Sequence, residues 1–176
     1  VTAVLERRNA LERSDNRGKT EVLAANLDTL AIVIAPEPKA DFFIADRFLC
    51  AAALMGARGL VVWNKIDLNR PEPPEIDQYR ALGYAVVAVS SKSGLGIAAL
   101  AGELGSGNSM LVGQSGVGKS SLINCLIDTA DVSIGGLSSA SREGKHTTTA
   151  SFAHHLGTGG FLIDSPGIRD FAPVIN

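Results

Sequence analysis

The sequence predicts an α/β fold in which a mixed, mostly parallel six-stranded sheet carries helices on both faces. Three observations lead to this prediction. The 176 residues are 45% hydrophobic and 19% charged, which is typical of one globular domain with its own core. Short β-branched runs alternate along the chain with segments of helical periodicity. A glycine-rich loop at residues 113–120 joins one such run directly to a helix.

The first half of the chain is expected to supply three strands and two helices. Clusters of β-branched and aromatic residues predict strands at residues 31–35, 60–63 and 84–89. Helical periodicity predicts helices at residues 42–57 and 75–82. Alternating strands and helices of this kind build parallel sheets that are covered on both faces.

The second half completes the sheet. Helices are expected at residues 95–104 and 118–127, and a strand at residues 110–112 follows a break at 105–109. Residues 131–149 have no period and predict a long loop, a feature that is often functional in compact domains. The last two strands, at residues 151–156 and 161–163, are joined by a short turn and must therefore be antiparallel.

Composition excludes several classes of protein. A net charge of −2 and a pI near 5.9 give no electrostatic reason for this domain alone to bind nucleic acid. Cys50 and Cys125 lie in apolar stretches without metal-ligand spacing, so we expect two buried thiols. No signal peptide and no apolar run of membrane-spanning length is present, which favours a reducing cytoplasm and no membrane partner.

The loop at residues 113–120, Gly-Gln-Ser-Gly-Val-Gly-Lys-Ser, matches the full phosphate-loop pattern and lies between a predicted strand and helix. Backbone N–H groups and the positive end of the helix dipole favour phosphate there, which makes this a phosphate-loop NTPase fold. Lys119 is expected to reach the β- and γ-phosphates and to act in catalysis, and Ser120 is expected to bind Mg²⁺. The alternative is a glycine-rich turn that happens to precede a helix. The expected phosphate-side contacts are Gly113, Ser115, Gly116, Val117, Gly118, Lys119, Ser120 and Ser121.

A second acidic motif follows the last strand. Asp164 ends an apolar run and begins Asp-Ser-Pro-Gly, which alone would be an ordinary turn. Beside a phosphate loop, Asp164 is suited to hold the Mg²⁺ hydration shell opposite Ser120, and the Gly167 N–H is suited to contact the γ-phosphate.

Two polar segments at predicted strand ends suit a guanine base. Asp67 can accept hydrogen bonds from guanine N1–H and the 2-amino group, a donor pair that adenine lacks. Asn64 can tether neighbouring loops, and the Lys65 stem can lie along the base. Residues 90–92 (Ser90, Ser91 and Lys92) offer a backbone N–H for guanine O6 and a second lysine stem. Each segment alone is also readable as an exposed turn, but ligands bind at this end of open α/β sheets.

The order of these motifs is unusual, because the base segments precede the phosphate loop. The chain therefore resembles a circularly permuted GTPase, and most of all the ribosome small-subunit-dependent RsgA/YjeQ family. The resemblance rests on residues 24–28 (Ala-Ala-Asn-Leu-Asp), 113–121, 144–149 (Gly-Lys-His-Thr-Thr-Thr) and 164–171. Permuted GTPases of the large subunit tend instead to carry Pro-Asn in the phosphate loop.

The resemblance implies a domain organisation and a partner. Residues 1–20 are expected to be a remnant of, or linker from, a missing N-terminal domain, and 21–176 the permuted GTPase domain. The family implies GTP or GDP with Mg²⁺, and zinc only in a C-terminal module that this chain lacks. It also implies that the 30S subunit and its 16S rRNA are partners and stimulate the GTPase, through flanking domains; we expect a monomer.

Catalysis is expected to depend on the loop at 131–149. Small GTPases place a water-orienting glutamine directly after Asp-x-x-Gly, and here Ile168 occupies that position. His146 is the candidate water-positioning group, because an imidazole titrates near neutral pH. The chemistry alone fits an exposed loop histidine equally well, and the resemblance favours the catalytic role. Thr148 is the favoured Mg²⁺ ligand of the loop, with Thr147 and Thr149 left open.

Three functions remain open from the sequence. The first is a GTPase of small-subunit maturation, and the second is a non-catalytic guanine-nucleotide switch with negligible hydrolysis in isolation. The third, an ATP-dependent kinase of small molecules, leaves residues 64–67 and 90–92 unexplained.

Overall fold

The computed structural model describes residues 6–14, 20–133 and 151–164. Its main sheet has six strands in the order β5-β4-β3-β6-β8-β7. Every neighbouring pair is parallel except β7 and β8, which are antiparallel. The strands are β3 (Thr29–Ile34), β4 (Arg58–Trp63), β5 (Ala85–Ala88), β6 (Asn108–Val112), β7 (Phe152–His155) and β8 (Phe161–Asp164).

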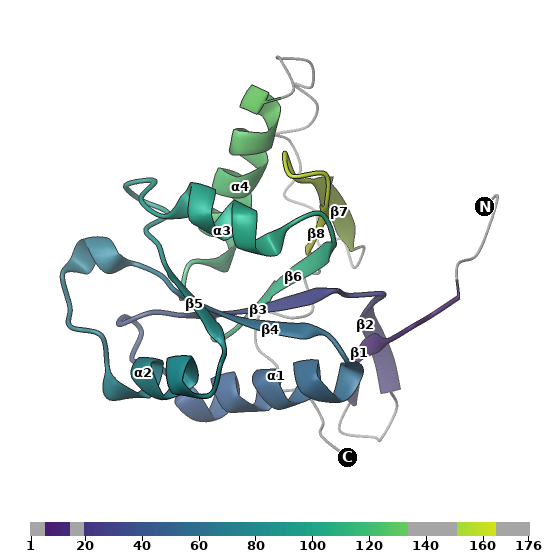
Figure 1. Ribbon diagram of the computed structural model, residues 1–176, viewed down its shortest axis with the longest axis horizontal. Helices are drawn as coiled ribbons and strands as arrows, with labels where there is room; N and C mark the ends of the chain where they lie inside the picture. Colours follow the sequence, from purple (N-terminus) through teal and green to yellow (C-terminus); the bar gives the residue numbers. More distant parts are fainter. Residues whose placement is uncertain (1–5, 15–19, 134–150, 165–176) are drawn as a thin grey trace.

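Helices cover both faces of this sheet (Figure 1). α1 (Phe42–Met55) and α2 (Pro74–Ala81) lie on one face, and α3 (Ile97–Leu104) and α4 (Lys119–Ser133) lie on the other. Side chains alternate along each buried strand, so Leu30 and Ile32 of β3 pack toward α1, while Ala31 and Val33 belong to the core beneath α3 and α4. The near-continuous apolar sequence of β3 follows from this burial on both faces.

The predicted fold class is confirmed, including the six strands and the antiparallel last pair. The bounds of several elements differ. α3 begins at Ile97 rather than at 95, and β6 begins at Asn108, inside the stretch expected as a break. α4 extends to Ser133, six residues beyond the predicted end of the helix at 127 and into the predicted loop.

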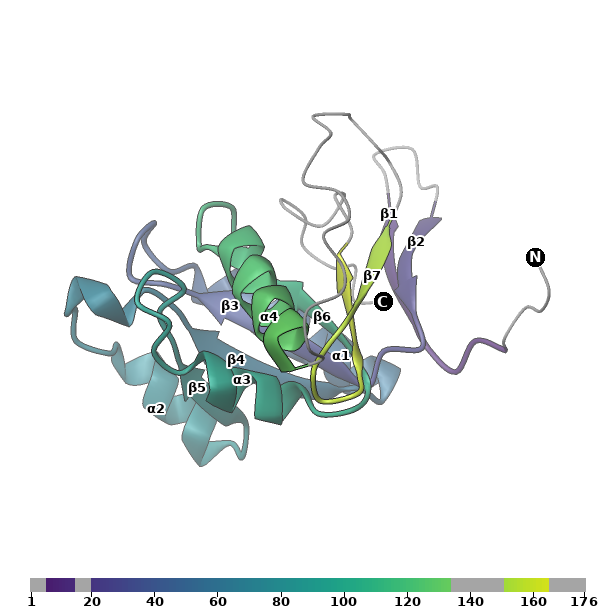
Figure 2. The ribbon, with the colours of Figure 1, turned by 90° about the horizontal axis from the view of Figure 1, so that it is seen from above.

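A hairpin that the sequence pattern did not predict precedes the main sheet. β1 (Ala10–Ser14) and β2 (Thr20–Ala25) pair antiparallel, with a bulge between Leu11 and Glu12. Leu11 is 1% exposed and Leu23 is 6% exposed, and both belong to the α1-side core. Figures 1 and 2 show the hairpin at the side of the molecule where β3 begins.

The two cysteines were both expected to be buried, and for Cys50 this is wrong. Cys50 is exposed on the outer side of α1, between residues 49 and 51, which face the core, and Cys125 is half-buried on α4. An apolar stretch of a helix still turns one side to solvent, which is why composition misplaced Cys50. Within the described residues, no helix is long and apolar enough to cross a membrane.

Candidate nucleotide-binding site

The predicted site segments converge at one edge of the sheet. β3, β4, β5, β6 and β8 run parallel, so their carboxyl ends lie at the same edge. β6 leads there into the phosphate loop, β4 leads into Asn64, and β5 leads toward Ser90. Asp164 ends β8, which is hydrogen-bonded to β6. Ligands bind at this edge in open α/β sheets.

The phosphate loop needs glycine at positions 113 and 118 because the backbone of β3 and the Asn64 side chain approach it closely. Gly113 has φ +135°, and a Cβ there would lie 2.2 Å from the Val33 carbonyl oxygen on β3. Gly118 has φ +97°, and a Cβ there would lie 2.5 Å from Asn64 Nδ2. A side chain at either position would collide with its neighbour, and positive φ adds strain. The loop therefore sits directly against β3 and the base segment.

Lys119 begins α4 and curls back over the loop. Its Nζ donates to the carbonyl oxygens of Gly113 and Gln114, each at 2.7 Å. The ammonium thus lies over the concave side of the loop, where the phosphates of a nucleotide would bind. Ser120 and Ser121 follow it in the first turn of α4 and are exposed.

Asn64 joins the phosphate loop to the base segments. It is fully buried, and its Nδ2 donates to the Val117 carbonyl at 2.9 Å. Its Oδ1 accepts from the Ser91 backbone N–H at 3.3 Å. One amide therefore holds two loops that lie 53 and 27 residues away in the chain. The tether that the sequence suggested for Asn64 is present.

Lys65 makes a second connection, through a loop that the sequence analysis did not include. Its backbone is left-handed, with φ +64°, and its Nζ donates to the carbonyls of Glu37 at 2.6 Å and Gly116 at 2.8 Å. Glu37 lies in the loop between β3 and α1, and Pro38 of that loop lies beside Gly116. The position of this loop in the sequence could have identified it, because the loop follows the buried strand β3 and so lies at the carboxyl edge of the sheet.

Asp67 is oriented by Ser90. The Ser90 hydroxyl is buried and donates to Asp67 Oδ1 at 2.7 Å, while it accepts from the Ser93 N–H at 3.1 Å. The Ser90 N–H itself donates to the Leu95 carbonyl at 2.9 Å. Ser90 therefore fixes the direction of the carboxylate, and its own N–H is already engaged within the loop.

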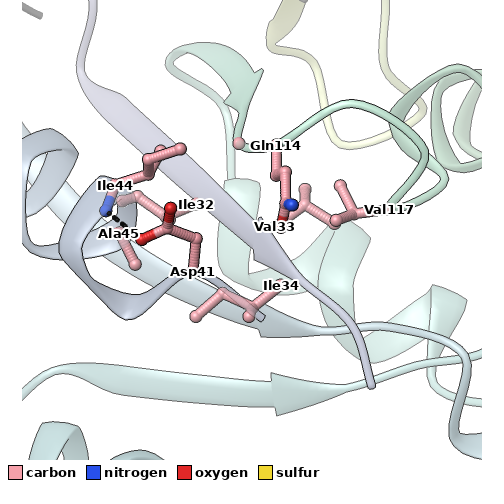
Figure 3. A pocket seen from close by; sticks show the side chains of 9 residues that line it. Ile32, Val33, Ile34, Asp41, Ile44, Ala45, Gln114 and Val117 are labelled. Atoms are coloured by element: carbon pink, nitrogen blue, oxygen red, sulfur yellow. Dashed lines mark hydrogen bonds between the residues drawn. The ribbon is translucent and has the colours of Figure 1, made fainter. Parts of the chain in front are cut away.

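A small cavity lies behind the phosphate loop, between β3 and the start of α1 (Figure 3). Asp41 caps α1 there, accepting from the Ile44 N–H at 3.2 Å. Gln114 points from the loop toward Val33, and its Oε1 is buried without a hydrogen-bond partner among the described residues. The walls are otherwise apolar, so the cavity is unsuited to a triphosphate. Its lining residues are Ile32, Val33, Ile34, Asp41, Ile44, Ala45, Gly113, Gln114 and Val117.

The described residues that the sequence suggested as metal ligands are oxygen donors. Ser120 offers a hydroxyl at the start of α4, and Asp164 offers a carboxylate at the end of β8, beside the strand that carries the phosphate loop. This donor set fits Mg²⁺, which prefers one or two protein oxygens together with phosphates and water. No cluster of three His, Cys, Asp or Glu side chains occurs in the described ranges. His146, Thr148 and Gly167 lie outside the described residues.

Comparison with known proteins gives a consistent result. Residues 4–173 match the family model described as RsgA GTPase. The chain is 44% identical to the small ribosomal subunit biogenesis GTPase RsgA of Pseudomonas savastanoi pv. phaseolicola, over 97% of this chain and 51% of that protein. It is also 44% identical to the Azotobacter vinelandii protein of the same name, over 98% of this chain and 52% of that protein. The chain thus spans about half the length of these relatives.

Solved structures agree on the fold. YjeQ from Thermotoga maritima superposes with a TM-score of 0.66 at 29% identity, covering 95% of this chain and 54% of that one. YloQ, described as a circularly permuted GTPase, superposes with a TM-score of 0.57 at 20% identity, covering 89% and 55%. The second likeness supports the fold alone.

Proposed function

The chain belongs to the RsgA GTPase family, and on that premise we propose that it binds guanine nucleotide with Mg²⁺ and hydrolyses GTP to GDP and phosphate. The observation that carries this proposal is the arrangement around Asn64, which joins the phosphate loop to the segment 90–92. Adenine lacks the paired donors that a carboxylate fixed at Asp67 would accept, so an ATP-binding kinase does not explain this residue. Phosphate and base recognition are instead built as one unit.

Guanine recognition is assigned to Asp67 and the segment beside it. An oriented carboxylate matches the paired N1–H and 2-amino donors of guanine, and the Ser90 hydroxyl supplies that orientation. Because the Ser90 N–H is engaged with Leu95 and the Ser91 N–H with Asn64, we assign the O6 contact to the Lys92 N–H. The aliphatic stems of Lys65 and Lys92 are assigned to the faces of the base.

Phosphate binding is assigned to the loop and Lys119. The backbone N–H groups of Gly116, Gly118 and Ser120 and the start of α4 favour anionic oxygens. The Lys119 ammonium exchanges the carbonyls of Gly113 and Gln114 for phosphate oxygens. Ser120, Asp164 and Thr148 are proposed to hold Mg²⁺, which neutralises charge on the phosphates when bound. The Gly167 N–H is proposed to contact the γ-phosphate.

Hydrolysis requires an oriented water rather than a covalent intermediate. We assign that role to His146, since Ile168 stands where small GTPases carry glutamine. His146→Ala should slow single-turnover GTP hydrolysis by about 100-fold, a typical contribution of a general acid–base group, with GTP affinity unchanged. Hydrolysis at the original rate would remove His146 from the mechanism and leave nucleotide binding intact.

The relatives' name supplies the proposed cellular role, which is biogenesis of the small ribosomal subunit. We propose that this role is carried out in the cytoplasm. We propose that 30S subunits, through their 16S rRNA, stimulate hydrolysis, and that regions present in the longer relatives assist this contact. Phosphate release by the 176-residue chain should be measured with and without 30S subunits. Equal release would place stimulation outside this domain, and no release in either case would favour a non-catalytic switch.

The deciding experiment is a nucleotide titration followed by fluorescence of Trp63, the single tryptophan, which precedes Asn64 directly. GDP and GTP should saturate the signal, and ATP should not. Asp67→Asn replaces a carboxylate oxygen by an amide donor, and xanthine carries a carbonyl oxygen where guanine has its 2-amino group. The variant should therefore lose GDP and gain xanthosine diphosphate. Loss of both nucleotides, or ATP binding equal to GDP binding in the unmodified chain, would overturn the guanine site.

A further inference from the structure

The segment 24–28, Ala-Ala-Asn-Leu-Asp, has no part in the nucleotide site. It lies where β2 passes into β3, at the amino-terminal edge of the parallel strands and opposite the phosphate loop (Figure 2). Asn9, Asn26, Asp28 and Asn108 gather there, and we call these four residues the basal junction. Together they connect the approach to the hairpin, the start of β3 and the start of β6.

Asn9 fastens the approach to the hairpin. Its Oδ1 accepts from the Leu27 N–H at 2.9 Å, and its Nδ2 donates to the Leu27 carbonyl at 2.8 Å. The same Nδ2 donates to the carbonyl of Met55, at the end of α1, at 3.3 Å. One side chain thus imitates a strand partner for residue 27 and also reaches α1.

Asn26 fastens the same segment from the other side. Its backbone is left-handed, with φ +58°, a conformation that asparagine tolerates better than most residues. Its N–H donates to the Asn9 carbonyl at 3.0 Å. Its side chain accepts from the Arg8 N–H at 2.7 Å and donates to the Glu6 carbonyl at 3.1 Å. Residues 6–9 are therefore held here by hydrogen bonds to their backbone groups.

Asp28 ties this arrangement to β6. Its Oδ2 accepts from the Asn108 N–H at 2.8 Å, and its own N–H donates to the Asn108 carbonyl at 2.8 Å. Asn108 returns a bond from its Nδ2 to the Asn26 carbonyl at 2.9 Å. Asp28 Oδ1 meets the Arg8 guanidinium at 3.1 Å. The Asp28 side chain lies so close to Gly107 that a Cβ added at residue 107 would lie 2.8 Å from it.

β6 carries this connection to the phosphate loop. Only four residues, 109–112, separate Asn108 of the basal junction from Gly113. β3 and β6 are paired along this length, from Thr29 with Ser109 to Ile32 with Val112. At the far end, Gly113 packs against the Val33 carbonyl without room for a Cβ. The same pair of strands is therefore pinned at both ends, by Asp28 at the base and by Gly113 at the loop.

We propose that the basal junction is a positioning device, which locks the chain entering at residues 6–9 to the strand that carries the phosphate loop. A displacement of that entering chain is then carried by β3 and β6 together to the phosphate loop and changes nucleotide affinity. A body joined to the amino-terminal side of this domain would act on the phosphate loop through this route. The effect on affinity rests on the proposed guanine-nucleotide site, whereas the mechanical connection does not.

Amide hydrogen exchange and GDP titration on the 176-residue chain test the proposal. Asp28→Asn removes one of two carboxylate acceptors, so it should speed exchange in the hairpin and at residues 113–118. It should also weaken GDP binding by about threefold to tenfold, the usual size of such couplings. Arg8→Ala, which removes only a partly exposed contact, should give a smaller change of the same pattern and serves if Asp28→Asn does not fold.

Two control variants separate coupling from general destabilisation. Asp77→Asn makes the same chemical change on α2, where the carboxylate is exposed, and should alter neither reading. Ile76→Val weakens the fully buried core beneath α2 and should leave residues 113–118 and GDP affinity unchanged. Faster exchange confined to the hairpin, or equal changes in Ile76→Val, would overturn the proposal. If the unmodified chain bound no GDP, the proposed function would fail. Amide exchange at residues 113–118 would still test the mechanical connection between the basal junction and the phosphate loop.

Discussion

The two edges of the main sheet use polar side chains in different ways. At the carboxyl edge, Lys65 donates to neutral backbone carbonyls of neighbouring loops, and Lys119 donates to those of its own phosphate loop. At the amino-terminal edge, Asn9, Asn26 and Asp28 satisfy backbone groups of segments that meet there. A phosphate attracts an ammonium more strongly than a neutral carbonyl does. The Lys119 bonds at the carboxyl edge are therefore suited to exchange for phosphate, and those of the basal junction are suited to permanence.

Asn64 differs from the two lysines at the carboxyl edge. It lies at the carboxyl edge, yet it is fully buried and pairs with backbone groups as the basal asparagines do. A ligand edge needs at least one fixed point, because loops that each moved separately could not present base and phosphate contacts together. Residues with exchangeable bonds and residues with fixed bonds are thus distinguished by their bonding partners, rather than by their distance from the ligand.

The largest expected effect comes from a residue with exchangeable bonds. Lys119→Ala should weaken GDP binding by about 100-fold, because a charged hydrogen-bond partner of the phosphates is lost. The free energy of unfolding without nucleotide should change by less than ~1 kcal/mol, since two of the partners that it leaves are neutral carbonyls of its own loop. Calorimetric titration and urea unfolding measure the two quantities. Lys39→Ala, at an exposed lysine in the loop after β3, is the control. A large loss of stability would make Lys119 a structural residue and break the comparison.

The next effect concerns the fixed point. Asn64→Ala should lower the free energy of unfolding by about 2 kcal/mol, because the Val117 carbonyl and the Ser91 N–H lose a buried partner. GDP binding should weaken as well, since both loops are released. Urea unfolding gives the first number, and Asn124→Ala, at an exposed position of α4, is the matched control. Unchanged stability with weakened binding would place Asn64 with the exchangeable residues.

The sequence predicted the carboxyl edge of the sheet far better than the amino-terminal edge. The phosphate loop is a local pattern, in which glycines, a lysine and a serine at fixed spacing leave little choice of geometry. Asp67 and Asn64 were identified because they follow buried strands, and this position alone brings them to one edge. The loop containing Glu37 was missed, because its contribution is a carbonyl oxygen that every residue possesses.

The hairpin and the basal junction depend on contacts that no local window contains. Residues 10–14 carry the charges of Glu12 and Arg13, so their composition is typical of an exposed segment. Leu11 nevertheless packs into the core, and Arg13 pairs with Glu21 across the hairpin. Asp28 meets Asn108, 80 residues away, which explains why resemblance marked the segment 24–28 without giving it a role.

The smallest predicted effect is a pH dependence of folding stability, which comes from Asp28 at the basal junction. The bond from the Asn108 backbone N–H, assisted by Arg8, lowers the pKa of Asp28 from its ordinary value of 3.8. A carboxyl whose pKa is lower in the folded state adds stability that is complete above the pKa of the unfolded chain, and that stability is lost as the pH falls through the folded value. The Asp28 side chain is 40% exposed, so solvent screening limits the contribution to below ~1 kcal/mol.

Asp28→Asn should therefore destabilise the chain at neutral pH, and its effect should shrink as the pH falls below 3.8 and through the lower pKa of Asp28 in the folded state, where the carboxyl becomes protonated. Urea midpoints for the variant and the unmodified chain, measured from neutral pH downward without nucleotide, should converge in acid. Asp77→Asn, at an exposed carboxylate on α2, gives the course expected for a surface charge. A constant difference at every pH would mean that Asp28 acts through shape alone. The permanence of the basal junction would then rest on its asparagines, and the two edges would differ in packing rather than in charge.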